Sequence, residues 1–241
     1  MISSLLRSIG IARLLSAYLL RQPGWLIQDV LFALSLLVIL HSWAGREGVA
    51  YAITGYISSS AFSFGVSGVG QVLSWSRAMR TLELYVASPI TPRLFLLGAI
   101  IGEIPYFIVI SFYYTLIGAM IGQLWIVFFA VSVALLISPL SILLGLAAAF
   151  YVKRPANLTA ITYPLTFVGT MLPPVFYPVT ALPESVRLLA MIVPTASGAE
   201  LARTLAGISS EFDPLLLFGI IASWTAISFL FANKVVKWSL D

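Results

Sequence analysis

The sequence predicts an all-α integral membrane protein, a single transmembrane domain over residues 1–241 in which six transmembrane helices cross the bilayer. Hydrophobic residues make up 60% of the chain and charged residues only 9%, whereas a soluble domain carries about 25% charged residues. Six apolar segments are each long enough to cross a hydrocarbon core of ~30 Å. None alternates like a membrane barrel strand, so helices are expected. The segments are approximately 25–43, 50–75, 94–122, 124–152, 158–179 and 214–236.

Residues 1–22 precede the first span and are expected to form an interfacial helix. Arg7, Arg13 and Arg21 interrupt the apolar part of this segment, which excludes the continuous apolar core of a signal peptide. Arg7 and Arg21 share roughly one helical face. The pattern is typical of a moderately amphipathic helix on the cytoplasmic surface, ended by Pro23.

The connection over residues 76–93 is too polar to enter the bilayer. We expect a short helix over 77–86 that stops at Ser88-Pro89, because proline cannot continue a helix.

The external connection over residues 180–213 contains two apolar stretches too short to span, which favours re-entrant or interfacial helices. The first begins at Pro183-Glu184, where proline suits an early helical position. The second carries Ser197 and Glu200 at capping-box spacing and ends near Gly207. Glu184 with Arg187, and Glu200 with Arg203, lie at helical neighbour spacing.

Basic residues determine the predicted orientation. With the N-terminus inside, ten of the thirteen Lys and Arg residues lie at cytoplasmic positions, and only Arg46, Arg187 and Arg203 lie outside. This bias is the positive-inside pattern of a multi-pass protein. We expect a plasma-membrane protein with both termini in the cytoplasm.

Several kinds of chemistry are missing from the chain. It has no G-x-x-x-x-G-K-[ST] phosphate loop, no cysteine and only one histidine, His41. An ATP site of that kind is therefore excluded, and a conventional zinc site is disfavoured. No basic stretch is interleaved with aromatic residues, so the net charge of +4 does not indicate nucleic-acid binding. We expect a non-enzymatic protein that binds no metal or cofactor itself.

Two acidic residues lie within the predicted spans. Glu103 follows Arg93 by ten residues, which places it ~15 Å into the bilayer. A carboxyl group there faces a wet cavity, or packs helices together in its protonated form. Asp29 lies near the cytoplasmic end of the first span, where it can pair with Arg21 or lipid headgroups.

Two polar and aromatic strips are candidates for a substrate path. One lies on the second span and the other on the fifth. Small residues crowd the second span, so close helix packing is the alternative explanation. With Glu103, the candidate path residues are Tyr56, Ser60, Phe64, Ser67, Tyr163, Phe167, Thr170 and Met171.

Two motifs resemble the ABC-2 type membrane permeases of ABC exporters, and the resemblance covers nearly the whole chain. The cytoplasmic connection contains an R-T-L-E run over 80–83, followed by Ser88-Pro89 and Arg93. The region after the fifth span has the family's P-x-F-x-P, L-P, P and E-x-x-R succession. Its residues are Pro174, Phe176, Pro178, Leu182, Pro183, Pro194, Glu200 and Arg203.

The resemblance implies a homo- or heterodimer of type V exporter-like subunits in membrane lipid, with two ATP-binding subunits that hold ATP and Mg²⁺. Residues 77–93 would be the coupling helix, and the second and fifth spans would line the path. The implied coupling residues are Arg77, Arg80, Thr81, Glu83, Ser88, Pro89 and Arg93. The implied external gate residues are Pro174, Phe176, Pro178, Pro183, Glu200 and Arg203.

The predicted activity is outward transport of a hydrophobic or amphipathic substrate, such as a drug, a lipid or a related small molecule. The segment before the first span has only Arg21-Gln-Pro, whereas sugar-polymer exporters of this family have a more basic pattern. An ion-coupled secondary carrier and a membrane-embedded lipid-modifying enzyme are the alternatives. Glu103 favours the carrier, whereas the clustered acids or His/Ser pair that the enzyme needs are missing.

Overall fold

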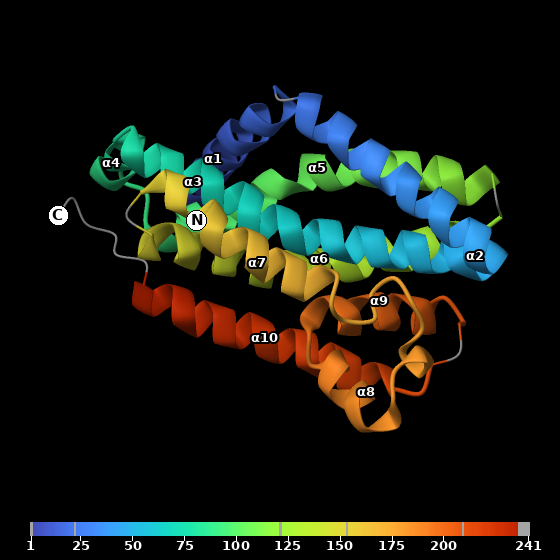
Figure 1. Ribbon diagram of the computed structural model, residues 1–241. Helices are drawn as coiled ribbons and strands as arrows, with labels where there is room; N and C mark the ends of the chain where they lie inside the picture. Colours follow the sequence, from blue (N-terminus) through green and yellow to red (C-terminus); the bar gives the residue numbers. More distant parts are fainter. Residues whose placement is uncertain (1, 22, 121, 153, 209, 236–241) are drawn as a thin grey trace.

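The computed structural model describes residues 2–21, 23–120, 122–152, 154–208 and 210–235, and these residues form a helical bundle with no strand (Figure 1). The first half contains α1 (Ile2–Leu20), α2 (Pro23–Ser63), the π-helix η1 (Phe64–Val69), α3 (Gly70–Ala78), α4 (Thr81–Ala87) and α5 (Pro92–Met120). The second half contains α6 (Leu124–Tyr151), η2 (Pro155–Asn157), α7 (Thr159–Thr170), η3 (Val179–Ala181), α8 (Glu184–Met191), α9 (Pro194–Leu205) and α10 (Pro214–Val235).

Four helical stretches of the described chain are long and apolar enough to cross a membrane. They are Leu26–Ala78, Leu94–Met120, Leu124–Tyr151 and Pro214–Lys234. The all-α integral membrane prediction is therefore confirmed at this level. The last residue of the predicted sixth segment, Val236, and the basic residues Lys153 and Lys237 lie outside the described residues.

The longest of these stretches is a hairpin. At Gly45 the backbone has φ 56° and ψ −130°, which is not helical. Figure 1 shows that the chain reverses there, so that the part of α2 after Gly45 returns through the bundle and continues into η1 and α3. Gly48 lies so close to the Leu40 carbonyl that a Cβ atom would collide with it. The first two predicted segments are therefore separate helices, as expected from the sequence.

The fifth predicted segment is helical for only part of its length. The helix α7 has 12 residues, or roughly 18 Å, which is shorter than the hydrocarbon core. Turns follow from Met171 to Pro178. Pro173 and Pro174 explain this end, because proline lacks the amide donor and restricts the residue before it. The prediction of a continuous segment through residue 179 was wrong.

The bundle is organised around α6, which contacts α2, η1, α3, α5, α9 and α10. Small residues allow the closest contact. A Cβ atom at Gly65 would collide with Ser141, and one at Gly145 would collide with the Gly65 carbonyl. The Ser141 hydroxyl donates to the Ala61 carbonyl at 3.1 Å. The small residues of the second span therefore serve close packing, as in other membrane helix pairs.

The N-terminal helix α1 packs along the first half of α5. The Ser8 and Ser16 hydroxyls donate to the Leu94 and Gly102 carbonyls at 3.2 and 3.0 Å. Ser8 and Ser16 are eight residues apart, and so are their acceptors Leu94 and Gly102. The two helices therefore run in the same direction. At Gly98 a Cβ atom would lie 2.7 Å from Ile11. The helix expected over residues 1–22 is thus a packed part of the bundle.

Candidate functional site

The end of the bundle that carries α4 presents an exposed surface. Arg80 has φ 58° and makes the turn between α3 and α4. Its side chain is 83% exposed and that of Glu83 54% exposed, with 3.9 Å between Arg80 Nε and Glu83 Oε1. Met79 and Leu84 are 69% and 70% exposed. We call Met79, Arg80, Glu83 and Leu84 the α4 surface.

The other predicted coupling residues hold α4 in place. Arg77 donates to the Ala149 and Val152 carbonyls at the end of α6 and lies over the Phe150 ring, with Cζ 5.0 Å from its centroid. Three further hydrogen bonds hold this connection. Thr81 Oγ1 donates to the Ser76 carbonyl at 2.9 Å, Ser88 Oγ to the Tyr85 carbonyl at 2.7 Å, and the Arg7 guanidinium to the Pro89 carbonyl at 2.8 Å. The Arg93 side chain lies outside the described residues.

At the opposite end, Arg203 is fully buried and satisfied from three directions. Its guanidinium pairs with Glu200 at 3.0 Å and donates to Thr54 Oγ1 at 3.0 Å. The Tyr51 ring lies 4.1 Å from Arg203 Cζ. Both Tyr51 and Thr54 belong to the returning part of α2. The predicted Glu200–Arg203 pair is therefore confirmed, and it joins α9 to α2.

The loop after α7 completes the surroundings of Arg203. The guanidinium donates to the carbonyl oxygens of Pro174, at 3.5 Å, and of Val175. Gly55 permits this approach, because a Cβ atom there would lie 2.8 Å from the Phe176 ring. Burial lowers the pKa of the Arg203 guanidinium, while the Glu200 carboxylate opposes that change. Because the ordinary value is so high, the group stays charged.

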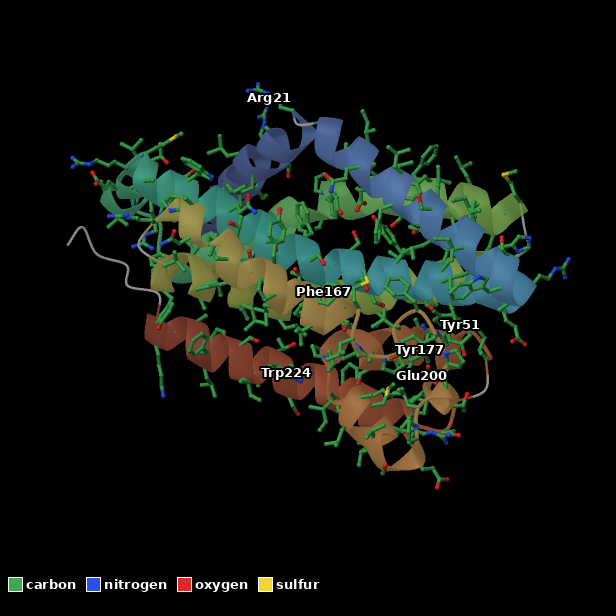
Figure 2. All side chains as sticks on the ribbon, in the orientation of Figure 1. Arg21, Tyr51, Phe167, Tyr177, Glu200 and Trp224 are labelled. Atoms are coloured by element: carbon green, nitrogen blue, oxygen red, sulfur yellow. The ribbon has the colours of Figure 1, made fainter. Side chains whose placement is uncertain are left out.

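A cavity of about 900 Å³ adjoins this pair at the end of the bundle. Figure 2 shows Tyr51, Tyr177 and Glu200 near one another there, and all three line the cavity. Phe176 and Pro178 also line it. Five of the six predicted external gate residues therefore lie together; Pro183 instead precedes α8 as its N-cap.

Two predicted details of the external region were wrong. Ser197 does not cap a helix, because α9 begins three residues earlier at Pro194, and the Ser197 hydroxyl donates to the Met191 carbonyl. Arg187 pairs with Glu211 at 2.9 Å rather than with Glu184. The stop at Gly207 is confirmed: it has φ +86°, and Ile208 N donates to the Arg203 carbonyl at 3.0 Å, the pattern of a Schellman motif.

A second polar cluster was not predicted from the sequence. Asp29 accepts hydrogen bonds from Tyr56 and, at 3.5 Å, from Tyr113. Arg21, the predicted partner of Asp29, instead projects away from the bundle at the corner between α1 and α2 (Figure 2). The reversal at Gly45 folds the helix that carries Tyr56 back against the helix that carries Asp29. The Tyr114 ring packs 5.7 Å from Tyr56.

The two predicted path strips have different surroundings. The strip on α2 and η1 is buried within the subunit: Ser60 Oγ and Tyr106 OH lie 2.8 Å apart, and Phe64 stacks on Tyr106 with 3.9 Å between centroids. Ser67 is also buried. In the α7 strip, Tyr163, Phe167 and Met171 are exposed by 62%, 64% and 37%, whereas Thr170 is buried. The structure of one chain does not bring the two strips together.

Glu103 is 1% exposed. Among the described residues, neither carboxyl oxygen forms a well-directed hydrogen bond. The Ser138 hydroxyl on α6 lies near enough to interact with the carboxyl, but Ser138 Oγ also lacks such a bond there. A carboxyl group without a counter-ion is costly at membrane depth.

The sequence model of a family described as ABC-2 type transporter matches residues 11–206. No curated protein matches the chain. The matched range runs from α1 through α9 and includes both ends of the bundle described above.

Proposed function

Because this chain belongs to the ABC-2 type transporter family, we propose that it is the membrane-spanning permease of an ATP-driven exporter. The family is one of transporter membrane subunits, which are not themselves enzymes. In the proposal, two copies of an ATP-binding subunit hydrolyse ATP with Mg²⁺ at the cytoplasmic end. The permease moves a hydrophobic or amphipathic substrate, such as a drug, a lipid or a related small molecule, outward across the plasma membrane.

The exposure of the α4 surface carries this proposal. Met79 and Leu84 place apolar side chains in the open next to the charged Arg80 and Glu83. An apolar centre with a charged rim is the usual composition of a protein interface. Arg77 fixes the end of α3, just before α4, to the end of α6. A force applied to this surface would therefore reach the bundle instead of bending a loose loop.

A continuous helix connects the two ends of the bundle. It runs over residues 46–78 through the second part of α2, η1 and α3, and at 1.5 Å per residue it is roughly 50 Å long. Its outer end carries Tyr51 and Thr54, which contact Arg203. We propose that closure of the ATPase moves this helix as a rigid body, with the π-helical turn as its hinge.

The proposed topology has six spans. The reversal at Gly45 divides the stretch Leu26–Ala78 into two crossings. The helices α5, α6 and α10 supply three more, and α7 with the turns after it supplies the sixth. We propose that α8 and α9 are external re-entrant helices. The burial of α9 between α2, α6 and α10 supports this placement. Ten basic residues at cytoplasmic positions support cytoplasmic termini.

We propose that the exposed strip of Tyr163, Phe167 and Met171 on α7 faces the second permease chain of a homo- or heterodimer. Large apolar side chains on one face indicate either lipid or a protein partner. The path would lie between the two subunits, next to this strip. The buried residues Tyr56, Ser60, Phe64, Ser67 and Thr170 would then support the path from behind, unless the helices separate during transport.

An ion-coupled carrier is the second candidate function. The buried carboxyl of Glu103 favours it, because such groups in membranes often relay protons. An ion-coupled carrier works without an ATPase and therefore needs no docking surface at α4. The two functions therefore differ in whether a soluble partner is needed.

Co-purification tests the exporter proposal. A tagged chain is co-expressed with an ATP-binding subunit encoded beside it and isolated in detergent. We expect wild type and the Glu184→Lys control to retain the ATPase and Glu83→Lys to lose it, because both variants reverse a charge on an exposed helix but only Glu83 lies on the α4 surface. Equal retention by the two variants would contradict the docking surface, and no ATPase with wild type would contradict the proposed function.

A further inference from the structure

Arg21 lies level with the middle of α5, and its side chain is exposed (Figure 2). The Ser16 hydroxyl on α1 donates to the Gly102 carbonyl at 3.0 Å, and the Tyr113 hydroxyl donates to the Asp29 carboxylate on α2 at 3.5 Å. Gly102 and Tyr113 are 10 and 21 residues beyond the first residue of α5. The corner between α1 and α2 therefore lies between these two levels, roughly 15–30 Å along a helix about 43 Å long.

The surroundings of Glu103 give a second measure of this depth. Glu103, the residue after Gly102, interacts with the Ser138 hydroxyl, and Ser138 is at the midpoint of α6. The bond from Ser16 to Gly102 is therefore level with the middle of a second membrane helix. Arg21 continues the last turn of α1 through its backbone N–H and lies ~7 Å beyond Ser16.

The face of α1 that carries Arg13 and Arg21 is turned away from the bundle and is otherwise apolar. Both arginines are exposed, and Leu6, Ile9 and Leu14 are exposed by 62%, 46% and 58%. The two arginines are roughly 12 Å apart along the helix axis and ~80° apart around it. Two guanidinium groups therefore project from an apolar face at membrane depth, where an unpaired charge is costly.

The described chain places no carboxylate where it would neutralise these arginines. It holds three ion pairs, and neither Arg13 nor Arg21 belongs to one. Asp29 accepts hydrogen bonds from two tyrosines, and Glu103 is 1% exposed. The other acidic residues of the described chain lie at the ends of the bundle: Glu47, Glu83, Glu184, Glu200, Glu211 and Asp213. Within the described residues, a second copy of this chain would thus bring no free carboxylate to the level of Arg21.

We propose that Arg13 and Arg21 bind the headgroup phosphate of an anionic glycerophospholipid, and that this lipid is the transported substrate. The proposal rests on the proposed function and names a substrate class for it. A phosphodiester matches the planar guanidinium, which donates two parallel hydrogen bonds to it. The acyl chains would lie along the apolar part of the same face of α1. In this proposal the two arginines lie within the bilayer instead of at the cytoplasmic surface expected from the sequence.

The arginines of α1 form a series from the α4 end of the bundle to its middle. Arg7 is exposed and donates to the Pro89 carbonyl beside α4 at 2.8 Å. Arg13 follows ~9 Å further along the helix and Arg21 another ~12 Å beyond it. A phosphate leaving the inner leaflet would pass from one guanidinium to the next while its chains stay in hydrocarbon. Arginine at this depth also draws in water and thins the bilayer locally, which shortens the apolar barrier.

A fluorescent reporter beside Arg21 tests the site in the purified chain. The sequence contains no cysteine, and Gly24 is exposed with no atom within 4 Å of a Cβ placed there, so Gly24→Cys labelled with bimane should leave the site intact. The chain is reconstituted in phosphatidylcholine with either phosphatidylglycerol or phosphatidylcholine that carries a nitroxide quencher on an acyl chain. The two quenching curves give the ratio of the local association constants. We expect phosphatidylglycerol to be favoured about fivefold, the effect of one basic residue on an anionic lipid.

Variants in the same reporter chain separate Arg21 from general attraction to a basic protein. Arg21→Gln should bring the ratio close to one, whereas Arg46→Gln, which removes an exposed arginine at the hairpin end of the bundle, should leave it unchanged. A bimane at Gly219→Cys on α10, where a Cβ also has open space, should report no preference. A ratio near one beside Arg21, or a preference that survives Arg21→Gln, would overturn the proposal. Competition by inorganic phosphate would indicate a water-exposed anion site and would overturn the lipid site.

Transport tests the substrate class separately. The chain is reconstituted with its ATP-binding subunit, and dithionite reduction follows the movement of phosphatidylglycerol with a fluorescent acyl chain between the leaflets. Mg-ATP should accelerate this movement, and Arg21→Gln should slow it about fivefold with the ATPase still bound. An intact, ATP-hydrolysing complex that does not move phosphatidylglycerol would contradict the substrate class. The quenching assay contains no ATPase, so its failure leaves the co-purification result untouched.

Discussion

The buried Arg203 gives the most quantitative prediction. Replacing it with methionine removes the 3.0 Å pair with Glu200, the 3.0 Å hydrogen bond to Thr54 and the contact with the Tyr51 ring. It also leaves Glu200, which is 4% exposed, without its counter-ion. Losing one partner of a buried ion pair costs about 3–5 kcal/mol. We expect Arg203→Met to lower the free energy of unfolding by about that amount.

Unfolding in mixed micelles titrated with dodecyl sulfate measures this change. Arg187→Met is the control, because it removes a partly exposed pair with Glu211 and hydrogen bonds to the Thr180 and Leu182 carbonyls. Its loss of unfolding free energy should be smaller, about 1–2 kcal/mol. Arg203→Lys keeps the charge but cannot reach Glu200, Thr54 and the loop carbonyls together. The loss of unfolding free energy in Arg203→Lys should be intermediate, about 1–3 kcal/mol.

A double variant separates the ion pair from simple packing. If Glu200 is costly because it is left charged, Glu200→Gln should partly rescue Arg203→Met, with a coupling of about 0.5–3 kcal/mol. Additive losses would refute the buried pair as the source of the effect. So would an Arg203→Met variant that is no less stable than Arg187→Met.

Three further changes test the hairpin, the helix packing and the unpredicted cluster in the same unfolding assay. Gly45→Ala should destabilise the chain by about 1–3 kcal/mol, because φ 56° with ψ −130° is a conformation that residues with a Cβ rarely adopt. Gly219→Ala in α10 has open space and an ordinary φ, so it should be neutral or stabilising. Equal effects of the two variants would contradict the reversal. Gly145→Ala should cost about 1–3 kcal/mol, because its Cβ meets backbone carbonyls of η1 that cannot move aside, and a neutral result would exclude that contact. Asp29→Ala should cost about 0.5–1.5 kcal/mol, because it removes the carboxylate that accepts from Tyr56 and Tyr113 but leaves the Asp29 backbone carbonyl as an acceptor for the Tyr56 hydroxyl. Tyr56→Phe should suppress part of that loss, and independent effects would argue against the hydrogen bond.

The helices were predictable where one physical rule dominated. Lipid requires a hydrogen-bonded backbone, so apolar length alone located α5, α6 and α10. The same rule predicted too long a helix at α7, because it does not include the backbone restriction at Pro173 and Pro174. The cap at Ser197 failed for a similar reason: Pro194 began α9 earlier, and Ser197 found an acceptor at the Met191 carbonyl.

The candidate site was predictable where its residues are close in sequence. Glu200 and Arg203 are one turn apart, so their pairing follows from helix geometry. Arg203 is also buried by Thr54 and Val175, which come from distant segments of the chain. These partners could be identified only from the fold. Asp29 is expected from its place near the end of the first span to pair with Arg21 or lipid headgroups, whereas the hairpin brings Tyr56 against it.

ATP-driven transport in proteoliposomes tests the central claim most directly. The chain is reconstituted with its ATP-binding subunit in inverted orientation, and uptake is followed for a panel of fluorescent amphipathic dyes and labelled lipids. We predict that Mg-ATP drives accumulation of at least one probe, that a protonophore does not abolish it, and that Glu83→Lys does. Movement of the probes by the permease alone, driven by a proton gradient without ATP, would contradict the exporter and favour the carrier.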